Sequence, residues 1–510
     1  MANRHGAKST LRALNRKMKT LSFPKKMKLT GRMISKPFGN RKPLYLGGYY
    51  DEDVPNPAEE ERIRRCHEEN IRLRQNSAGT MSSGEKSMKE GTDCGSYIAI
   101  AADSLDKGGL ERVIELLANE WKKLGKEVKV FCIRSGGETA EKLKDEAGVE
   151  VLIFDFDTDK LREYITKNPP LVVNTHFLHE GIEVFYERGI PIVEVIHNMY
   201  VFLDYGQWCF EERKYGYVDQ YVAVSGCAKD VFLKKFPDAS EEKITVIGNA
   251  FGIPEDAAVS SDNGKADPEI PGSETDNDLP DRSSRMKIRN EFKIPGDAFI
   301  FLSAGSIDPR KNNLGMVKAF AGLRKQTDRE CRLLLAGSES DEAYAKKVRK
   351  LVEKEKLQDS VIFAGQRSDV SDLMKASDAM LMISYFEGWS VAATEAIAAG
   401  LPIIHSRCGS AEELICGGQN GILVDNPVRD IAGYSFEDLL DAMEEGINEN
   451  PDEVMKAMLS MIRDENEWKQ RRKEIARFAT EHFDSEKVAK EYLTLFSGIL
   501  KEMYNMETKT

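Results

Sequence analysis

Several features that define common protein classes are missing from this 510-residue sequence. No apolar stretch approaches the roughly 20 residues that cross a bilayer, and the N-terminus lacks the apolar segment of a secretory signal. None of the eight cysteines belongs to a C-x-x-C pair or a zinc-spaced Cys/His cluster. The net charge of −12 argues against general nucleic-acid binding, because phosphate backbones require a basic surface. The scattered thiols favour a cytoplasmic protein.

Positive charge is concentrated at the start of the chain. Residues 1–50 contain thirteen Lys or Arg and no Asp or Glu. Leu11, Leu14, Met18 and Leu21 recur there at helical spacing. A basic amphipathic helix can bind an anionic membrane surface, so residues 1–50 are interpreted either as a peripheral contact with the cytoplasmic membrane face or as a solvated tail.

Two successive strand–helix patterns predict an α/β fold. Apolar runs at 97–101, 128–133, 149–154, 171–174, 190–196 and 220–224 form the first pattern, and runs at 299–304, 332–336, 360–363, 379–383 and 402–405 form the second. Alternation with helical stretches builds a doubly wound parallel sheet. Ligands bind at the carboxyl ends of such strands, so two units predict a shared cleft.

The predicted domain division follows from composition. A basic and polar N-terminal extension covers 1–92, and a Rossmann-like domain covers 93–254. An acidic flexible linker at 255–287 follows, because residues 255–281 hold nine acids and one Lys. A second Rossmann-like domain covers 288–480. A C-terminal helix at 481–510 is expected to pack back toward the first domain.

The segment 387–395 carries the most informative candidate residues. It follows a buried strand, and Gly388 allows a tight turn into a helix whose N-terminal amides can hold a phosphate. Glu387 would stand over the cleft, and Glu395 suits hydrogen bonding to ribose hydroxyls. The alternative is that both are ordinary acids near a helix start, where the helix dipole favours them.

Two further loops follow strands and precede helices. Arg310 and Lys311 can neutralise a diphosphate, although a charge pair on a loop is more often solvated. Gly108 and Gly109 let the backbone approach a phosphate or sugar closely. The full G-x-G-x-x-G spacing is absent, so a dinucleotide site is unsupported.

Histidines also follow strands of the first unit. His197 comes just after the run at 190–196, at a carboxyl end that faces the predicted cleft. His176 and His179 lie near another strand end. For all three, a hydrogen-bonded loop histidine is the alternative interpretation.

Together these segments resemble the family-four retaining glycosyltransferases of the GT-B fold (glycosyl transferases group 1), over roughly residues 96–500. The family pattern E-G-aromatic-small-apolar, with a second Glu eight residues after the first, is met by Glu387 and Glu395. It continues through residues 398–403, 409–412 and 420–424. The resemblance implies an α/β protein with two Rossmann-like doubly wound parallel-sheet domains facing across a cleft. It also implies that the domain at 93–254 lies on the acceptor side and that the domain at 288–480 binds the nucleotide-sugar.

The resemblance also implies an activity and a set of roles. The enzyme would transfer a sugar from a nucleotide-sugar to a glycan, lipid-linked or other hydroxyl acceptor, as in polysaccharide biosynthesis, with retention of anomeric configuration and without cofactor or metal. The implied catalytic residues are His197 beside the anomeric carbon, Glu387 on the sugar and Lys311 on the diphosphate. The implied donor-binding residues are Gly108, Gly109, Arg310, Lys311, Gly388, Trp389, Ser390, Val391, Ala392 and Glu395.

Two departures from the family pattern keep other interpretations open. Ser306 stands where the family often has Arg, and Asn198 stands where it often has Asp. A sugar-nucleotide epimerase of the same fold and a non-catalytic interaction protein are the alternatives. The nearest acidic motif, residues 155–159, is interpreted as a turn whose acids cap a helix and not as a metal site.

Overall fold

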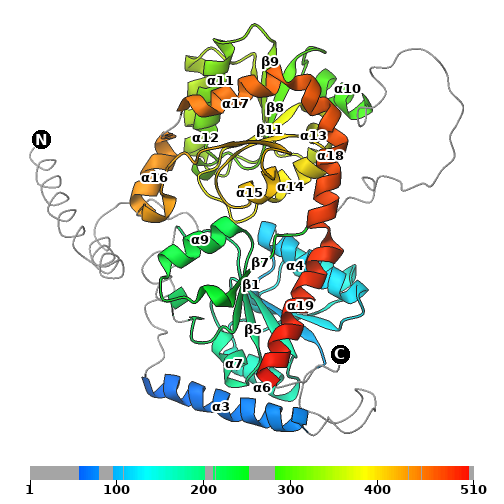
Figure 1. The fold of residues 1–510 in the computed structure, drawn as a ribbon, viewed down its shortest axis with the longest axis vertical. Helices are drawn as coiled ribbons and strands as arrows, with labels where there is room; N and C mark the ends of the chain where they lie inside the picture. Colours follow the sequence, from blue (N-terminus) through cyan, green and yellow to red (C-terminus); the bar gives the residue numbers. More distant parts are fainter. Residues whose placement is uncertain are drawn as a thin grey trace, which may run out of the picture.

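The structure is a computed structural model, and it describes residues 57–79, 96–106, 108–201, 211–212, 214–251, 282–434, 436–448 and 451–504. It contains two parallel sheets stacked along the long axis of the molecule (Figure 1). This confirms the predicted fold of two Rossmann-like domains. Residues 1–50, with their predicted basic helix, lie outside the described residues, as does most of the acidic linker.

The first sheet has seven strands in the order β3-β2-β1-β4-β5-β6-β7, all pairs parallel. The strands are β1 (Ile98–Ser104), β2 (Val128–Ser135), β3 (Glu150–Ile153), β4 (Val172–His176), β5 (Ile192–Ile196), β6 (Gln220–Ala223) and β7 (Ile244–Val246). The connecting helices are α4 (Gly109–Lys123), α5 (Glu138–Asp145), α6 (Thr158–Lys167), α7 (Ile182–Glu187) and α9 (Gly226–Lys235). Asp157 caps α6 by accepting from the amide of Lys160, which confirms the capping interpretation of this acidic turn.

The second sheet has six parallel strands in the order β10-β9-β8-β11-β12-β13. The strands are β8 (Phe299–Ala304), β9 (Cys331–Ala336), β10 (Val361–Gly365), β11 (Ala379–Met382), β12 (Ile403–Ser406) and β13 (Gly421–Val424). The helices of this domain are α10 (Arg282–Glu291), α11 (Asn313–Arg324), α12 (Glu342–Lys354), α13 (Val370–Ala376), α14 (Val391–Ala398), α15 (Ala411–Ile415), α16 (Phe436–Glu445), α17 (Pro451–Arg463) and α18 (Glu465–Phe483). Short 3₁₀ helices η1 (Glu241–Lys243), η3 (Pro309–Lys311) and η4 (Ile431–Gly433) complete the two domains.

The expected linker end at residue 287 is wrong, because α10 already begins at Arg282. Arg285 in this helix forms an ion pair with Asp378 at 3.0 Å, and Ile288 is fully buried. These contacts fix the helix to the second sheet, so the expected acidic linker ends before it.

The chain crosses between the domains twice, at neighbouring positions. The first crossing leaves after Phe251, whose amide donates to the carbonyl of Phe483 at 3.2 Å, and the second returns at Asp484. The returning helix α19 (Ser485–Tyr504) then packs along α4 of the first domain (Figure 1). The indole of Trp121 on α4 donates to the carbonyl of Ala489 at 3.0 Å.

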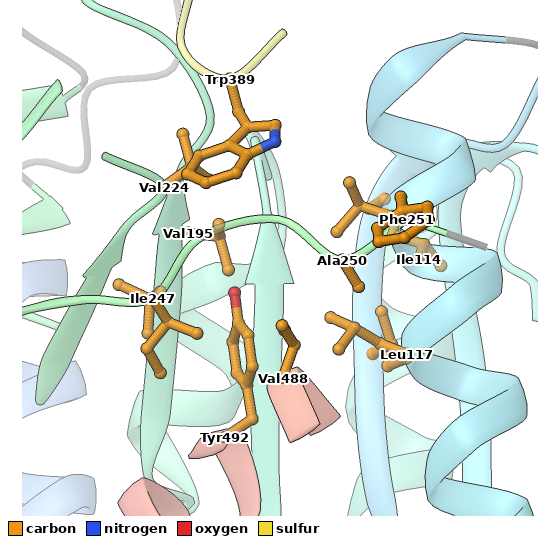
Figure 2. Packing of buried hydrophobic residues seen from close by; sticks show 14 of the residues in the cluster. Ile114, Leu117, Val195, Val224, Ile247, Ala250, Phe251, Trp389, Val488 and Tyr492 are labelled. Atoms are coloured by element: carbon orange, nitrogen blue, oxygen red, sulfur yellow. The ribbon is translucent and has the colours of Figure 1, made fainter. Parts of the chain in front are cut away.

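The core continues through this junction. Figure 2 shows Val488 and Tyr492 of α19 lying between β5 and α4, with Trp389 of the second domain above Val224. The two domains and the C-terminal helix therefore share one apolar cluster.

The helix α3 (Pro57–Gly79) was assigned to the N-terminal extension, but it packs against α7 and α19. Ile63 is buried, the ring of His67 stacks on Tyr186 at 3.8 Å, and Asn70 donates to the carbonyl of Glu187 at 2.7 Å. These contacts make α3 part of the first domain. It lies at the end of that domain away from the second domain (Figure 1).

Candidate active site

The segment 387–395 follows β11 and includes the first turn of α14, at the carboxyl edge of the second sheet. The side chain of Ser390 caps α14 by accepting from the amide of Ala393 at 3.2 Å. The amide of Ser390 donates to the hydroxyl of Ser410, also at 3.2 Å. Among the described residues, no hydrogen bond engages the amides of Val391 and Ala392. These two N–H groups at a helix N-terminus are available to an anion.

The carboxylate of Glu387 is buried between two cations from η3. Lys311 Nζ lies 2.6 Å from Glu387 Oε1, and Arg310 Nη1 lies 2.9 Å from Oε2. Burial opposes ionisation of Glu387, but the charges of Arg310 and Lys311 outweigh burial and lower its pKa to about 2. Glu387, Arg310 and Lys311 therefore form one charged group. This group brings together the two loops of the second domain that the sequence indicated.

Gly388 makes a close contact between the two domains. A Cβ atom on Gly388 would lie 1.7 Å from the carbonyl oxygen of His197, so only glycine fits there. The carbonyl of Gly388 accepts a hydrogen bond from the Ser225 hydroxyl at 3.0 Å. Nearby, the amide of Gly226 donates to Glu413 at 2.7 Å. The carboxyl edges of the two sheets thus meet at the predicted site.

Glu395 is exposed on α14 and faces the first domain. Desolvation by its surroundings raises the pKa of this carboxyl, and the charge of Arg112 on α4 opposes the rise. Gly108 is the N-cap of α4 and Gly109 is its first residue. A Cβ on Gly109 would meet no atom within 4 Å, whereas a Cβ on Gly108 would lie 2.4 Å from Glu111 Oε2. The turn is therefore open at Gly109, on the side of the interface that Glu395 faces.

The indole of Trp389 does not reach the charged group. It is buried against Gly248 and donates to Thr394 Oγ1 at 2.8 Å, and its ring centroid lies 5.0 Å from that of Phe483 in an edge-on arrangement. Only the backbone of Trp389 remains for the donor contact that the resemblance implied. Its side chain packs at the domain junction.

The two positions that depart from the family pattern have local roles. The hydroxyl of Ser306 donates to Asp308, which caps η3 by accepting from the amide of Lys311. The side chain of Asn198 accepts from the amide of Tyr200 at 2.8 Å. Both residues thus shape the loops that carry Lys311 and His197.

The three histidines that the sequence placed after strands, His176, His179 and His197, form two groups. His197 Nε2 lies 2.8 Å from His176 Nδ1, and His176 Nε2 lies 2.8 Å from Asn174 Oδ1. His179 Nδ1 lies 2.6 Å from Asp103 Oδ2, and Arg134 Nε lies 3.4 Å from the same oxygen. The sequence indicated the histidines by their position after strands, but it gave no signal for their partners.

A surface groove of about 1030 Å³ lies elsewhere, between η1, β7 and α19. Its lining includes Glu242, Val246, Lys490 and Glu491, and none of the predicted site residues. Among the described residues, no group of His, Cys, Asp and Glu side chains has the geometry of a metal site. None of the described helices is both long and apolar enough to span a bilayer.

The sequence matches two family models, one within each domain. Residues 107–251 match Glycosyltransferase Family 4, and residues 284–442 match Glycosyl transferases group 1. A D-inositol 3-phosphate glycosyltransferase from Pseudarthrobacter chlorophenolicus is 25% identical over 369 residues, which cover 66% of this chain and 82% of that protein. An N-acetyl-alpha-D-glucosaminyl L-malate synthase from Bacillus anthracis is 25% identical over 219 residues, 43% of this chain and half of that protein.

Solved structures share the fold. Anabaena Alr3699/HepE, crystallised in complex with UDP, superposes with a TM-score of 0.62 at 16% identity, covering 79% of this chain and all of that one. A glycosyltransferase from Rickettsia africae has the same TM-score at 18% identity, covering 79% of this chain and 99% of that one. At these identities the superpositions establish the two-domain architecture and nothing finer.

Proposed function

The chain belongs to the group 1, family 4 retaining glycosyltransferases of the GT-B fold, and on that premise we propose how its residues divide the work of sugar transfer. Such an enzyme moves a sugar from a nucleotide-sugar to an acceptor. The bond from the anomeric carbon to the diphosphate breaks, and a bond from that carbon to the acceptor oxygen forms. The acceptor proton leaves with the diphosphate.

Binding of the diphosphate is assigned to the second domain. Lys311 and Arg310 are two cations on one loop, and the free amides of Val391 and Ala392 lie at the start of α14. Fixed cations and helix N-termini stabilise charge that develops on a leaving diphosphate. The observation that carries the proposal is the placement of Glu387 on both cations, which keeps the charged group assembled before any donor binds.

The sugar and the ribose are assigned to residues around this group. Glu387 would bind hydroxyls of the transferred sugar, and His197 would lie beside its anomeric carbon. Glu395 would hold the ribose, with Gly108 and Gly109 on the opposite wall. Gly388 supports these positions because its missing side chain lets the second domain approach His197.

The acceptor is assigned to the carboxyl edge of the first sheet, and we propose a glycan or lipid-linked sugar. Asp103, Arg134 and His179 come from β1, β2 and the loop after β4, and they converge within hydrogen-bond or ion-pair distance. Phe156 follows β3 and is 54% exposed. The centroid of its ring lies 5.6 Å from the guanidinium carbon of Arg134. An exposed aromatic ring beside ionised groups suits a sugar, which presents both C–H and O–H faces.

Catalysis is proposed to need no metal, because the cations and amides can carry the diphosphate charge. Sugar release should persist in EDTA at the rate measured with added magnesium. Loss of activity in EDTA, restored by magnesium or manganese, would overturn this part of the proposal.

Residues 1–50 are proposed to hold the enzyme at an anionic membrane surface. Basic residues near such a surface contribute about 1 kcal/mol each. Liposomes with phosphatidylserine should sediment the full chain at low salt more than a chain lacking residues 1–50, and high salt should remove the difference. Equal sedimentation of both chains at low salt would contradict a membrane role.

The activity is tested with a panel of donors that includes UDP-glucose, UDP-N-acetylglucosamine and GDP-mannose. Release of nucleoside diphosphate, even by slow hydrolysis without an acceptor, supports an active transferase. Epimerised sugar without release would indicate an epimerase of this fold. Donor binding without any turnover, in the presence of a mixed glycan and lipid-linked acceptor pool, would indicate a non-catalytic protein.

A further inference from the structure

Three polar side chains of the first domain form a hydrogen-bonded row that ends at the domain interface. Asn174 and His176 lie on the same face of β4, and His197 follows the neighbouring strand β5. Asn174 and His176 are buried, and His197 is partly exposed. The hydrogen bonds of the row determine which nitrogen of each ring carries a proton.

The row starts from a backbone carbonyl, which can only accept. Asn174 Nδ2 lies 3.0 Å from the carbonyl oxygen of Val193, so the amide nitrogen must face that oxygen. The amide oxygen Oδ1 therefore faces His176, 2.8 Å from Nε2. Because Oδ1 is an acceptor, Nε2 of His176 carries the proton.

The proton on Nε2 of His176 also determines the tautomer of His197. Burial, and then the neighbouring His197, hold the pKa of His176 well below its usual range, and burial lowers the pKa of His197 to about 3. Both rings are therefore neutral near pH 7. A neutral His176 with a proton on Nε2 has a bare Nδ1, and this nitrogen lies 2.8 Å from His197 Nε2. Nε2 of His197 must donate, which leaves Nδ1 of His197 with a lone pair.

Within the described part of the chain, the only hydrogen bond of the His197 ring is the one from Nε2, so this lone pair has no partner there. The carbonyl of His197 touches Gly388, so the residue lies beside the segment that carries Glu387. We propose that Asn174 and His176 are positioning residues that hold His197 as its Nε2–H tautomer, so that Nδ1 accepts a hydrogen bond from a hydroxyl or amide proton of the transferred sugar. The inference rests on the proposed donor site.

The tautomer restricts the class of donor sugar. A lone pair on Nδ1 attracts a hydroxyl or an acylamino N–H and repels a carboxylate. The preferred donors are therefore neutral hexoses or N-acetylhexosamines, and uronic acid donors with a carboxylate at this position are disfavoured.

His405 in the second domain supplies an internal reference. Its Nδ1 lies 2.7 Å from the carbonyl oxygen of Ser406, so this buried ring must be the Nδ1–H tautomer. Nitrogen NMR of the full chain labelled with ¹⁵N-histidine distinguishes the tautomers, because bare and protonated ring nitrogens resonate far apart. We expect Nε2–H for His176 and His197 and Nδ1–H for His405, with signals assigned from single His→Gln variants.

Two substitutions of similar size separate positioning from packing. His176→Gln can present an amide N–H to Asn174 and an oxygen to His197, so it should keep the His197 tautomer and most of the turnover. His176→Leu removes both bonds, so His197 should become a mixture of tautomers and kcat/KM should fall about tenfold, the size of one lost hydrogen bond. The His405 signal must stay unchanged in both variants as evidence that they fold.

Two results would overturn the inference. One is a wild-type His197 with the proton on Nδ1. The other is an equal loss of turnover in His176→Gln and His176→Leu with the His197 tautomer unchanged, which indicates a packing role. The NMR result stands even if no donor is turned over, so failure of the proposed function and failure of this inference are distinguishable.

Discussion

His197 and Glu387 lie on opposite sides of the contact at Gly388, and their side chains differ in charge state. On the side of the second domain, Glu387 is ionised because two cations bind it. On the side of the first domain, His176 and His197 are neutral because burial disfavours their charged forms. At this contact the second domain thus presents the ion pairs of Glu387, and the first domain presents the neutral, oriented rings of His176 and His197.

This difference matches the two parts of a nucleotide-sugar. A diphosphate is anionic and gains charge as it leaves, so it requires cations. A neutral sugar offers hydroxyl groups, and oriented acceptors can select among them without attracting the diphosphate. Variants on each side of the interface should therefore have different consequences, and the predictions below follow from that separation.

The largest effect is expected where the two sides touch. Gly388→Ala places a methyl group 1.7 Å from the carbonyl oxygen of His197, so the domains must move apart at the site. We expect turnover to fall by about 1000-fold, because misplacement of reacting groups by about 1 Å already costs about 100-fold. Gly296→Ala is the control, since its added methyl meets no atom within 4 Å. Normal turnover of Gly388→Ala would show that this close contact is not needed.

Lys311→Ala should lower turnover by about 100- to 1000-fold, the usual result of removing a group that stabilises transition-state charge. Thermal unfolding should change much less than turnover. Lys346→Ala, at an exposed position on α12, should leave turnover unchanged. If Lys311→Ala kept turnover near that of the control, Arg310 would be the cation that holds the diphosphate.

Glu387→Gln tests whether Glu387 is ionised, through the dependence of the unfolding free energy on pH. The pKa of Glu387 is lowered from 4.5 to about 2, so its ion pairs stabilise the fold above about pH 4.5 and are lost as the pH falls toward 2. Wild type should exceed Glu387→Gln in unfolding free energy by at most about 3 kcal/mol at pH 7, and the difference should shrink by pH 3. Urea unfolding of both proteins at each pH measures it. A difference that stays constant with pH would contradict the ionised pair.

Glu395→Ala should weaken nucleoside diphosphate binding by about 1–3 kcal/mol, because hydrogen bonds to the ribose are lost. Calorimetry measures this directly, with Glu353→Ala on α12 as the surface control. A nucleotide lacking the 2′ and 3′ hydroxyls should bind wild type and Glu395→Ala alike. An equal loss with both nucleotides would remove the ribose assignment.

The sequence predicted the strands β8 and β9 well, because both are mostly apolar and lie in the core of a parallel sheet. It missed β7 and β13 as strands, since one has three residues, the other begins with Gly421, and both lie at sheet edges. Short edge strands carry little periodic signal.

The sequence indicated the individual residues of the candidate site but not the contacts between them. Glu387 and Lys311 stood out from motif and position, yet the sharing of Glu387 by Arg310 and Lys311 joins residues more than 70 positions apart. The burial of the Trp389 indole against Gly248 and the row from Asn174 to His197 depend on tertiary contacts of the same kind. No local pattern encodes such pairings.

The central claim is that the second domain binds the diphosphate and the first domain orients the sugar. Its most direct test is calorimetry, which measures binding of the nucleoside diphosphate released from the donor that the enzyme turns over. His197→Gln should bind this diphosphate like wild type while losing turnover of the complete donor. Lys311→Ala should lose both diphosphate binding and turnover. Weakened diphosphate binding in His197→Gln, or wild-type binding in Lys311→Ala, would contradict the assignment of the diphosphate to the second domain and of the sugar to the first.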